Sequence, residues 1–273
     1  MPDTAWIKQK GITREGDLAQ LSGVRHQFFL IKLQAGGVFH THRGSINHDD
    51  FIGIPWGSCV HSNTDNPFYI FQPGISDLLM TTKRTTQILY PKDIGYIIFT
   101  MNIGSGKKVL EAGSGSGGLT QVLAYMVGDT GHVFSYEVKS EMQKLAEKNV
   151  RKIGLEQRVS FINQDIAEGI QEKDMDAVFF DLPNPYDYID IAHNALTNGG
   201  FWGTLLPTTN QVERTLPKLR FGGFMLVDVV EIALRHYQPE ADRFRPVDRM
   251  VAHTGYLIFA RKAIRNSNIN ITE

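Results

Sequence analysis

Four acidic residues stand at or just after the ends of apolar segments of strand length: Glu111, Glu137, Asp165 and Asp181. A carboxylate in such a place can meet an ammonium group, accept hydrogen bonds from two ribose hydroxyls, or accept one from the exocyclic amine of a base. Because the carboxyl ends of parallel strands meet at one edge of a sheet, acids placed in this way can act on a single ligand. The residue types indicate a site for a nucleoside that carries positive charge.

The segment "VLEAGSGSGGLT" (109–120) has the order strand, glycine-rich turn, helix. Gly113, Gly115 and Gly118 match the spacing G-x-G-x-x-G, which lets a nucleotide approach bare backbone; an ordinary tight turn is the alternative interpretation. The loop has no lysine for phosphates, so S-adenosylmethionine, with an ammonium, a sulfonium and no phosphate, fits better than a dinucleotide. The predicted donor-binding residues of this segment are Glu111, Gly113, Ser114, Gly115, Ser116, Gly117, Gly118 and Leu119.

The next two acids extend the donor prediction. Glu137 ends "HVFSYE" (132–137), where a carboxylate can accept hydrogen bonds from both ribose hydroxyls. Asp165 follows "RVSFIN" (158–163), where it can accept a hydrogen bond from the exocyclic amine of adenine. Either acid alone could equally be a solvated strand end. The ordered set at consecutive strand ends favours one common ligand.

The fourth acid opens the stiff segment "DLPNPY" (181–186), directly after the apolar run "MDAVFF" (175–180). Pro183 and Pro185 restrict φ and bias the residues before them toward extended geometry. The loop after Asp181 is therefore predicted to be preorganised, with backbone carbonyls that can face a substrate. The alternative interpretation is a rigid connector in which Asp181 begins a helix.

Alternating strand and helix patterns after residue 75 provide the frame for these residues. The apolar segments of strand length are 107–113, 132–137, 158–163, 175–181 and 199–207. The segments with apolar residues at intervals of three and four are 118–128, 139–154 and 186–196. The alternation predicts an α/β fold with a mostly parallel sheet, right-handed crossovers and a ligand at the carboxyl ends of the strands.

Before residue 75 the chain has a different character. Short apolar runs, "HQFFLIKL" (26–33) and "FYIFQP" (68–73), are separated by turn-forming groups such as "AGG" and "PWGS". We therefore predict a small N-terminal β domain over 1–75, a donor-binding α/β domain over 76–262 and a polar tail over 263–273.

Composition limits the class of protein. The 273 residues are 42% hydrophobic, enough for a sizeable core, and the net charge of −1 leaves nucleic-acid binding to local basic patches. Cys59 is the single cysteine, which excludes an internal disulfide framework and fits a reducing compartment. No apolar stretch follows the lysines of the first residues, and no window approaches the length of a membrane span. We expect a soluble cytoplasmic protein with no membrane partner.

Several segments taken together resemble one family. Besides the glycine-rich segment, "SYE" and "DLPNPY", they are "RTTQILYPKD" (84–93), "RMVAHTGYLIFARK" (249–262) and, in the N-terminal domain, "THRGSINHDDFIGIPWGS" (41–58). They are similar to segments of the tRNA (adenine-N1)-methyltransferases that modify adenosine 58 in the T loop, and the similarity covers nearly the whole chain. The resemblance implies a Rossmann-like, seven-stranded class I methyltransferase sheet, S-adenosylmethionine as donor, a homotetramer as is usual in prokaryotes, and Asp181 as the catalytic acid. Family members often have Trp where this chain has Tyr186.

The chemistry of that reaction suits an acid such as Asp181. Adenine N1 has an in-plane lone pair, so methyl transfer from a sulfonium needs no strong base or metal. The attack spreads positive charge over the ring and the exocyclic amine, and a carboxylate bonded to that amine stabilises this charge as it develops. The carboxylate could also accept an amine proton.

Further residues are predicted to contact the donor or the substrate, with ordinary packing as the alternative for each. Tyr186 could stack on a base that has been flipped out of its helix. Gln87 could close over the donor. His253, Thr254 and Tyr256 alternate along a predicted late strand, and the resemblance implies that this end lies near the substrate, with His253 and Tyr256 as the predicted contacts. The histidines His40, His42, His48 and His61 have no accompanying cysteine or carboxylate pattern, so we predict no metal site.

Basic residues that could bind RNA are local. A late cluster combines arginines with two aromatic residues: Arg235, Arg243, Arg245, Arg249, Tyr237 and Phe244. Neighbouring acids offset much of its charge. Because phosphate contacts dominate affinity for nucleic acids, a nearly neutral monomer would have to combine patches from several subunits. This also favours a homotetramer.

The predicted function is methyl transfer from S-adenosylmethionine to N1 of adenosine 58 in the tRNA T loop, with adenosine 57 as a further candidate. One alternative is a methyltransferase of the same donor fold that acts on a protein carboxylate or a small molecule, although an acid at the acceptor would repel an anionic substrate. The other is a non-catalytic RNA-binding partner subunit, against which the intact acids and glycines argue.

Overall fold

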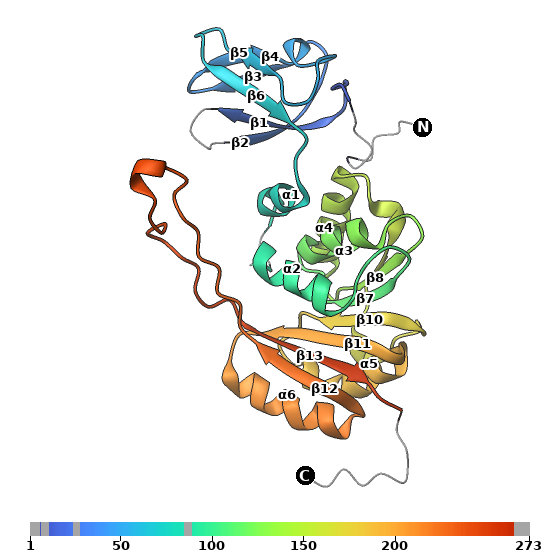
Figure 1. Ribbon diagram of the computed structural model, residues 1–273. Coiled ribbons are helices and arrows are strands. Elements are labelled where there is room, and N and C mark those ends of the chain that lie inside the picture. Colours follow the sequence, from blue (N-terminus) through green and yellow to red (C-terminus); the bar gives the residue numbers. More distant parts are fainter. Residues whose placement is uncertain (1–5, 7–10, 24–27, 85–88, 265–273) are drawn as a thin grey trace. The chain divides into compact units, whose positions relative to one another are not determined.

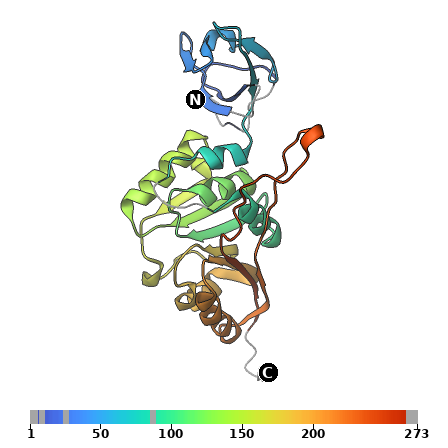
Figure 2. The ribbon, with the colours of Figure 1, turned by 90° about the vertical axis from the view of Figure 1, so that its left-hand side faces the viewer.

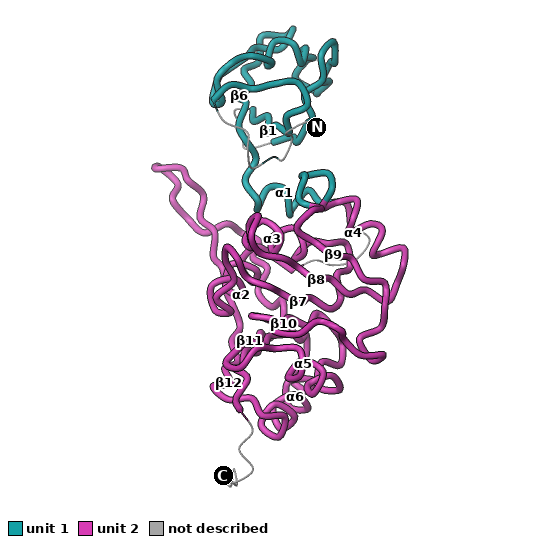
Figure 3. Tube along the Cα trace, turned by 90° about the vertical axis from the view of Figure 1, so that its right-hand side faces the viewer, with its two compact units in different colours: residues 1–82, 151–155 teal, residues 83–150, 156–273 magenta. Residues whose placement is uncertain are grey.

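The computed structural model describes Trp6 and residues 11–23, 28–84 and 89–264. The chain divides into two compact units, residues 1–82 with 151–155 and residues 83–150 with 156–273 (Figure 3). Each unit has a buried apolar cluster of its own.

The first unit is built mainly of β-strands. Its elements are β1 (Leu18–Gly23), β2 (Phe28–Lys32), β3 (Val38–Thr41), β4 (Gly44–Asn47), the 3-10 helix η2 (His48–Asp50), β5 (Cys59–His61), β6 (Pro67–Phe71) and α1 (Ile75–Thr81). Antiparallel pairing gives a sheet of order β2-β1-β6-β5 and a separate β3-β4 hairpin. Alternate residues such as Leu21, Phe68 and Ile70 point into the core. The predicted small N-terminal β domain is therefore confirmed.

The rest of the chain alternates strands and helices (Figure 1). Its elements are α2 (Pro91–Thr100), β7 (Lys108–Ala112), α3 (Gly118–Val127), β8 (His132–Tyr136), α4 (Ser140–Lys152), η3 (Glu156–Arg158), β9 (Val159–Ile162), η4 (Ile166–Glu168), β10 (Met175–Phe180), η5 (Pro185–Asp187), α5 (Ile189–Ala195), β11 (Leu196–Leu206), α6 (Thr209–Phe221), β12 (Phe224–Val230), η6 (Ala241–Arg243) and β13 (Tyr256–Lys262).

These strands form a seven-stranded sheet of order β12-β13-β11-β10-β7-β8-β9. The strands from β11 to β9 in this order are parallel, and β13 runs antiparallel to both of its neighbours. The predicted α/β fold with a mostly parallel sheet is confirmed. From β7 the chain continues to β8 and β9 on one side and then crosses to β10 on the other. Ligands of such sheets bind at this switch point, outside the carboxyl ends of β7 and β10.

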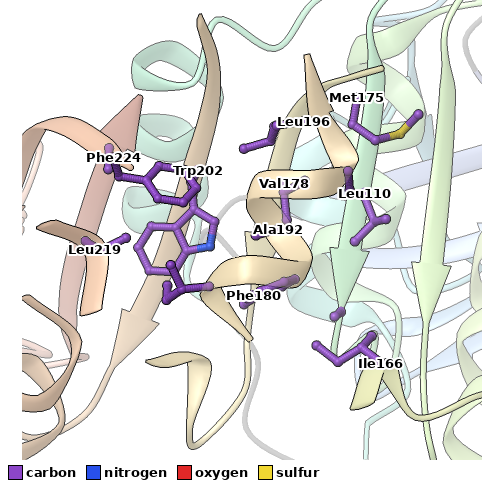
Figure 4. Packing of buried hydrophobic residues seen from close by; sticks show 14 of the residues in the cluster. Leu110, Ile166, Met175, Val178, Phe180, Ala192, Leu196, Trp202, Leu219 and Phe224 are labelled. Atoms are coloured by element: carbon purple, nitrogen blue, oxygen red, sulfur yellow. The ribbon is translucent and has the colours of Figure 1, made fainter. Parts of the chain in front are cut away.

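A buried aromatic group holds the end of β10 in place (Figure 4). The ring of Trp202 on β11 lies edge-on to Phe180, with centroids 6.4 Å apart, and tilted against Phe224 at 6.1 Å. The Thr204 hydroxyl donates a 2.6 Å hydrogen bond to the carbonyl of Phe180. Because Phe180 immediately precedes Asp181, these contacts fix the backbone from which that carboxylate projects.

The last strand is shorter than expected. His253 and Thr254, expected on a strand with Tyr256, precede β13, which begins at Tyr256. Both residues lie near the C-terminal end of a long connection, residues 231–255, here called the arm. The arm extends away from the sheet in both views (Figures 1 and 2). The arm contains Pro239 and Pro246 and forms one isolated bridge, between Tyr237 and Pro246, so most of its backbone has no ladder partner. Within the described residues, no helix combines the length and the apolar character needed to span a membrane.

Candidate active site

The glycine-rich loop brings the ends of β7 and β10 together. Gly113 has φ +92°, and a Cβ added there would overlap the carbonyl oxygen of Asp181. Its N–H donates to the carbonyl of Tyr136 at 2.9 Å, and the N–H of Asp181 donates to the carbonyl of Ala112 at 2.9 Å. Glycine is therefore required at the first position of the motif because the two strand ends touch through their backbones.

The same loop is bonded to Glu137 at the end of β8. Glu137 accepts hydrogen bonds from the backbone N–H of Gly115 at 2.9 Å and of Lys139 at 3.0 Å, one on each carboxylate oxygen. Each oxygen keeps a lone pair for a further donor, such as a ribose hydroxyl. Gly117, with φ +78°, lies so close to α4 that an added Cβ would be 2.8 Å from Cα of Ala146. The loop is thus held from both sides.

Glu111 is a buried carboxylate beneath the loop, 1% exposed. One of its oxygens accepts hydrogen bonds from the hydroxyls of Thr120 and Ser135, both at 2.6 Å. Burial raises the pKa of Glu111 to about 7; the two hydroxyls oppose the shift, and the charges of Asp181 and Glu137 add to it. An ammonium group in the adjoining cavity would favour the ionised form.

Two adjoining cavities, here called the donor cavities, lie beside the residues that are predicted to bind the donor. One, of about 440 Å³, is lined by Glu111, Glu137, Met142, Leu89 and the loop residues Gly113, Ser114, Gly115, Ser116, Gly118 and Leu119, among others. The other, of about 200 Å³, is lined by residues that include Glu137, Gln164, Asp165, Ile166 and Tyr188. Asp165 caps η4 by accepting from the N–H of Ala167 at 2.9 Å. The mixed apolar and acidic lining of the smaller cavity suits a base that carries an amine.

A third cavity, of about 470 Å³, also borders the start of "DLPNPY" and is here called the acceptor cavity. It is lined by Leu89, Tyr90, Asp93, Asp181, Leu182, Pro183, Leu205, Pro207, Gln211 and Thr254. Leu182 and Pro183 line all three cavities, and Asp181 lines this one and the larger donor cavity. Asp181 therefore stands where two bound molecules would meet.

Asp181 is an exposed residue that lines two of these cavities, but the protein atoms around its carboxylate leave that group poorly hydrated. This poor hydration raises the pKa of Asp181 to about 6, and the charge of Glu137 adds to the shift. At neutral pH the group is mostly ionised, but it can accept a proton more readily than an ordinary aspartate.

The loop after Asp181 is anchored through α6. The side-chain amide of Gln211 donates to the carbonyl of Pro183 at 2.8 Å, and its oxygen accepts from the hydroxyl of Thr208 at 2.7 Å. Sequence reasoning missed Gln211, Pro207 and Asp93. One signal was present: Pro207 directly follows the apolar strand β11 and comes shortly before α6, much as "DLPNPY" directly follows β10.

The three described residues that are predicted to contact the substrate lie outside the lining of the acceptor cavity. Tyr186 is half-buried on η5 with its hydroxyl 3.5 Å from Nη1 of Arg214. His253 bonds Glu231 at 2.7 Å and the carbonyl of Pro207 at 3.1 Å, and its ring lies 4.9 Å from that of Tyr256. These three predicted residues are not in the lining given above for the acceptor cavity, and their roles stay predictions. Gln87 lies outside the described residues.

Replacing Glu111 with Gln is expected to remove a pH dependence from donor binding. With a pKa of about 7, Glu111 is half protonated near neutrality, and a cationic ligand that pairs with it must first displace the proton. Affinity of the wild type for S-adenosylmethionine should rise between about pH 6 and about pH 8, approaching tenfold per pH unit at the acid end. Calorimetric titration at several pH values measures this.

The exposed Glu168→Gln variant is the matched control and should keep the wild-type slope. A wild-type affinity that does not change with pH, or a slope that survives in Glu111→Gln, would contradict the assignment. In the unliganded protein the raised pKa of Glu111 makes the free energy of unfolding fall with pH, whereas the affinity for the donor rises with pH. Protonated Glu111 favours the folded state, and this contribution is lost as the pH rises through about 7.

Within the described part of the chain, no three or more His, Cys, Asp or Glu side chains are grouped so that they could hold a metal ion.

Comparisons with known proteins agree over both units. A family described as "tRNA methyltransferase complex GCD14 subunit" matches residues 68–249, and one described as "TrmI-like N-terminal" matches residues 11–60. The tRNA (adenine(57)-N(1)/adenine(58)-N(1))-methyltransferase TrmI of Methanocaldococcus jannaschii is 34% identical over 82% of this chain and 87% of its own. The tRNA (adenine(58)-N(1))-methyltransferase TrmI of Thermus thermophilus is 32% identical over 86% of this chain and 92% of its own.

Solved structures give the same result. A SAM-dependent O-methyltransferase from Thermotoga maritima has a TM-score of 0.88 and 42% identity, covering 94% of this chain and 97% of its own. The tRNA (m1A58) methyltransferase TrmI from Aquifex aeolicus has a TM-score of 0.81 and 35% identity, covering 93% of this chain and all of its own. The switch-point site, the family match and these relatives together place the fold among the SAM-dependent methyltransferases. The chain belongs to the tRNA methyltransferase family of GCD14 and TrmI.

Proposed function

We propose that this protein transfers a methyl group from S-adenosylmethionine to N1 of adenosine 58 in the T loop of tRNA, with adenosine 57 as a further target to be tested. One observation carries the proposal: Asp181 lines both the larger donor cavity and the acceptor cavity. The tRNA substrate is proposed because the relatives named above are tRNA (adenine-N1)-methyltransferases.

The donor set fits S-adenosylmethionine. Glu111 would pair with the ammonium of the methionine part, Glu137 would accept from the ribose hydroxyls, and Asp165 would accept from the adenine amine. The bare backbone of the glycine-rich loop permits close approach. When bound, this donor supplies the sulfonium methyl group. The residues of the protein orient it toward the acceptor cavity.

Asp181 would act on the acceptor base. Its carboxylate can accept a hydrogen bond from the exocyclic amine while the ring gains positive charge, and this bond strengthens as the charge develops. The raised pKa of about 6 also lets it take a proton from the amine and pass it to water. Gln211 would keep the loop in position through the carbonyl of Pro183.

Transfer to oxygen is the second candidate, because the Thermotoga maritima relative is named an O-methyltransferase. Asp181 lines the acceptor cavity and would repel an anionic acceptor such as a carboxylate, whereas the charge of Asp93 is paired with Lys92. An adenine amine is a hydrogen-bond donor and is not repelled. The cavity therefore favours the base as acceptor.

The deciding experiment is incubation of the protein with unmodified tRNA transcripts and labelled S-adenosylmethionine, followed by mapping of the methylated nucleoside. We expect 1-methyladenosine at position 58. Transcripts with guanosine at 57 or at 58 separate the two positions. Methyl at N6, at a ribose oxygen or only on protein would overturn the proposal, and failure to bind the donor would revive the non-catalytic alternative.

We further propose a cytoplasmic homotetramer. The strand β12 lies at the edge of the sheet and exposes Met225, Leu226, Val227 and Val229. The arm exposes Leu234, Tyr237, Phe244, Met250 and Val251. An exposed apolar strand edge of this kind is a surface that proteins normally cover with another chain.

Replacing Val227 with Lys is expected to dissociate the assembly, because it places a charge within the apolar edge. Light scattering coupled to size-exclusion chromatography measures the mass in solution. The Ile264→Lys variant, at another exposed apolar position (69% exposed), should leave the mass unchanged. A wild type that elutes as a monomer would contradict the proposed assembly.

A further inference from the structure

Lys92 carries a buried ammonium group that the proposed reaction does not use, and it contacts two residues that line the acceptor cavity, Asp93 and Thr254. Its side chain is 6% exposed, and it follows the first residue of α2. The ammonium group donates to Oδ1 of Asp93 at 2.8 Å, to the carbonyl of Ile232 at 2.8 Å and to the hydroxyl of Thr254 at 2.6 Å. An ammonium has three N–H donors, so each one has a partner.

Two of these partners lie at opposite ends of the arm. Ile232 is its second residue and Thr254 its second-last, and between them the chain runs out to η6 and back (Figures 1 and 2). Hydrogen bonds across the outer arm include those from the N–H of Gln238 to the carbonyl of Arg245 and from the N–H of Val247 to the carbonyl of His236. At the base, His253 bonds Glu231 at 2.7 Å. The ammonium group of Lys92 thus bonds both ends of the arm to the first turn of α2.

The hydrogen bonds from Lys92 to Asp93, Ile232 and Thr254, here called the clamp, lie next to the acceptor cavity. Asp93 and Thr254 both line that cavity, and neither is in the lining of the two donor cavities. Asp93 is 1% exposed, and its second oxygen, Oδ2, has no hydrogen-bond partner among the described residues. Buried ion pairs cost desolvation energy, and apolar residues of similar size would fill the same space at least as stably. Packing alone therefore does not account for Lys92.

We propose that Lys92 is a positioning residue for the methyl acceptor: it fixes Thr254 in the wall of the acceptor cavity by tying both ends of the arm to α2. The proposal rests on the proposed function for its kinetic consequence. Through the contact of Lys92 with Thr254, the position of the arm determines the position of Thr254, and a displaced arm would change the wall against which the base binds. The donor cavities are not coupled in this way.

The test compares Lys92→Met, Thr254→Val and the double variant, with Lys173→Met at an exposed lysine as the matched control. Lys92→Met is expected to lower kcat/KM for tRNA by roughly 10- to 100-fold, the size of a lost hydrogen bond to a charged group. The dissociation constant for S-adenosylmethionine should change by less than about twofold. Because both residues act through one contact, the double variant should be little worse than Lys92→Met.

A second readout does not depend on methyl transfer. Hydrogen–deuterium exchange of peptides that cover residues 231–255 should be faster in Lys92→Met than in the wild type or the control, while peptides from β7 and β10 stay protected. If the wild type methylates no tRNA, the proposed function fails, and the exchange result still decides whether the clamp exists.

Lys92→Met leaves Asp93 buried without its partner and could unfold. The double variant Lys92→Met/Asp93→Asn removes both charges, and Thr254→Val alone leaves the ion pair intact, so a folded protein is available in each case. Equal losses of donor and acceptor affinity, additive effects of the two single changes, or unchanged exchange in the arm would overturn the proposal.

Discussion

Asp181→Asn is expected to lower kcat for methyl transfer by about 100- to 1,000-fold, the loss seen when one preorganised electrostatic contact is removed. Asparagine keeps the size of the side chain and one acceptor oxygen but has no charge to stabilise a cationic ring. The backbone at this position is fixed by β7 and by the packing of Phe180, so the substitution should not move the loop. Affinity for the donor should change by less than about threefold, since Glu111, Glu137 and Asp165 remain.

The matched control is Asp187→Asn on the same connection. Asp187 is exposed, accepts a hydrogen bond from the amide of Asn184 at 2.8 Å and is not in the lining of the three cavities. It should keep near wild-type activity. In the wild type, kcat should fall as the pH drops through about 6, because protonation removes the charge of Asp181. Retained activity in Asp181→Asn, or an acid limb that persists in it, would refute the role of the carboxylate.

Gly113→Ala is expected to abolish donor binding and to lower the free energy of unfolding by about 2 to 4 kcal/mol. Two effects add. Alanine is strained at φ +92°, and its Cβ would overlap the carbonyl oxygen of Asp181, which the buried end of β10 prevents from moving. Relief of the overlap has to separate the ends of β7 and β10, and this displaces both Asp181 and the loop above Glu111. Thermal unfolding and calorimetric titration with S-adenosylmethionine measure the two consequences.

Gly106→Ala separates backbone strain from the overlap. Gly106 has a similar φ of +82°, but its added Cβ would meet only the hydroxyl of Thr130, at an ordinary 3.6 Å. It should lose about 1 kcal/mol or somewhat more and bind the donor normally. If the two variants are equally stable and both bind the donor, the contact between the strand ends is not what requires glycine at position 113.

Local patterns in the sequence were sufficient to place the candidate donor residues near one another. Glu111 is the second-last residue of β7, and the glycine motif, Glu137 and Asp165 follow strands. In a parallel sheet the carboxyl ends of successive strands share one edge. Short-range order along the chain therefore predicted that they lie together. The same holds for the fold, because alternating strand and helix periods restrict the topology to a few arrangements.

The acceptor half depends on contacts between distant parts of the chain. Asp93 from α2, Gln211 from α6 and Thr254 from the arm are far apart in the sequence, and no spacing rule joins them. The expectation that His253 lies on a strand was wrong for a related reason. Strand pairing in this region requires a partner segment, and the described arm residues have a single isolated bridge.

The sequence by itself determined the fold class, the glycine motif and the acid at position 181 with the rigid segment that follows it. These features depend on periodicity, on backbone freedom at glycine and on the restricted φ of proline. The tertiary structure alone decided which cavities are lined by the start of "DLPNPY", why Gly113 admits no side chain, and that Lys92 joins the two ends of the arm. The physical reason is that the first set depends on neighbours within a few residues. The second depends on the burial of polar groups, whose hydrogen-bond partners are found only when the whole chain has packed.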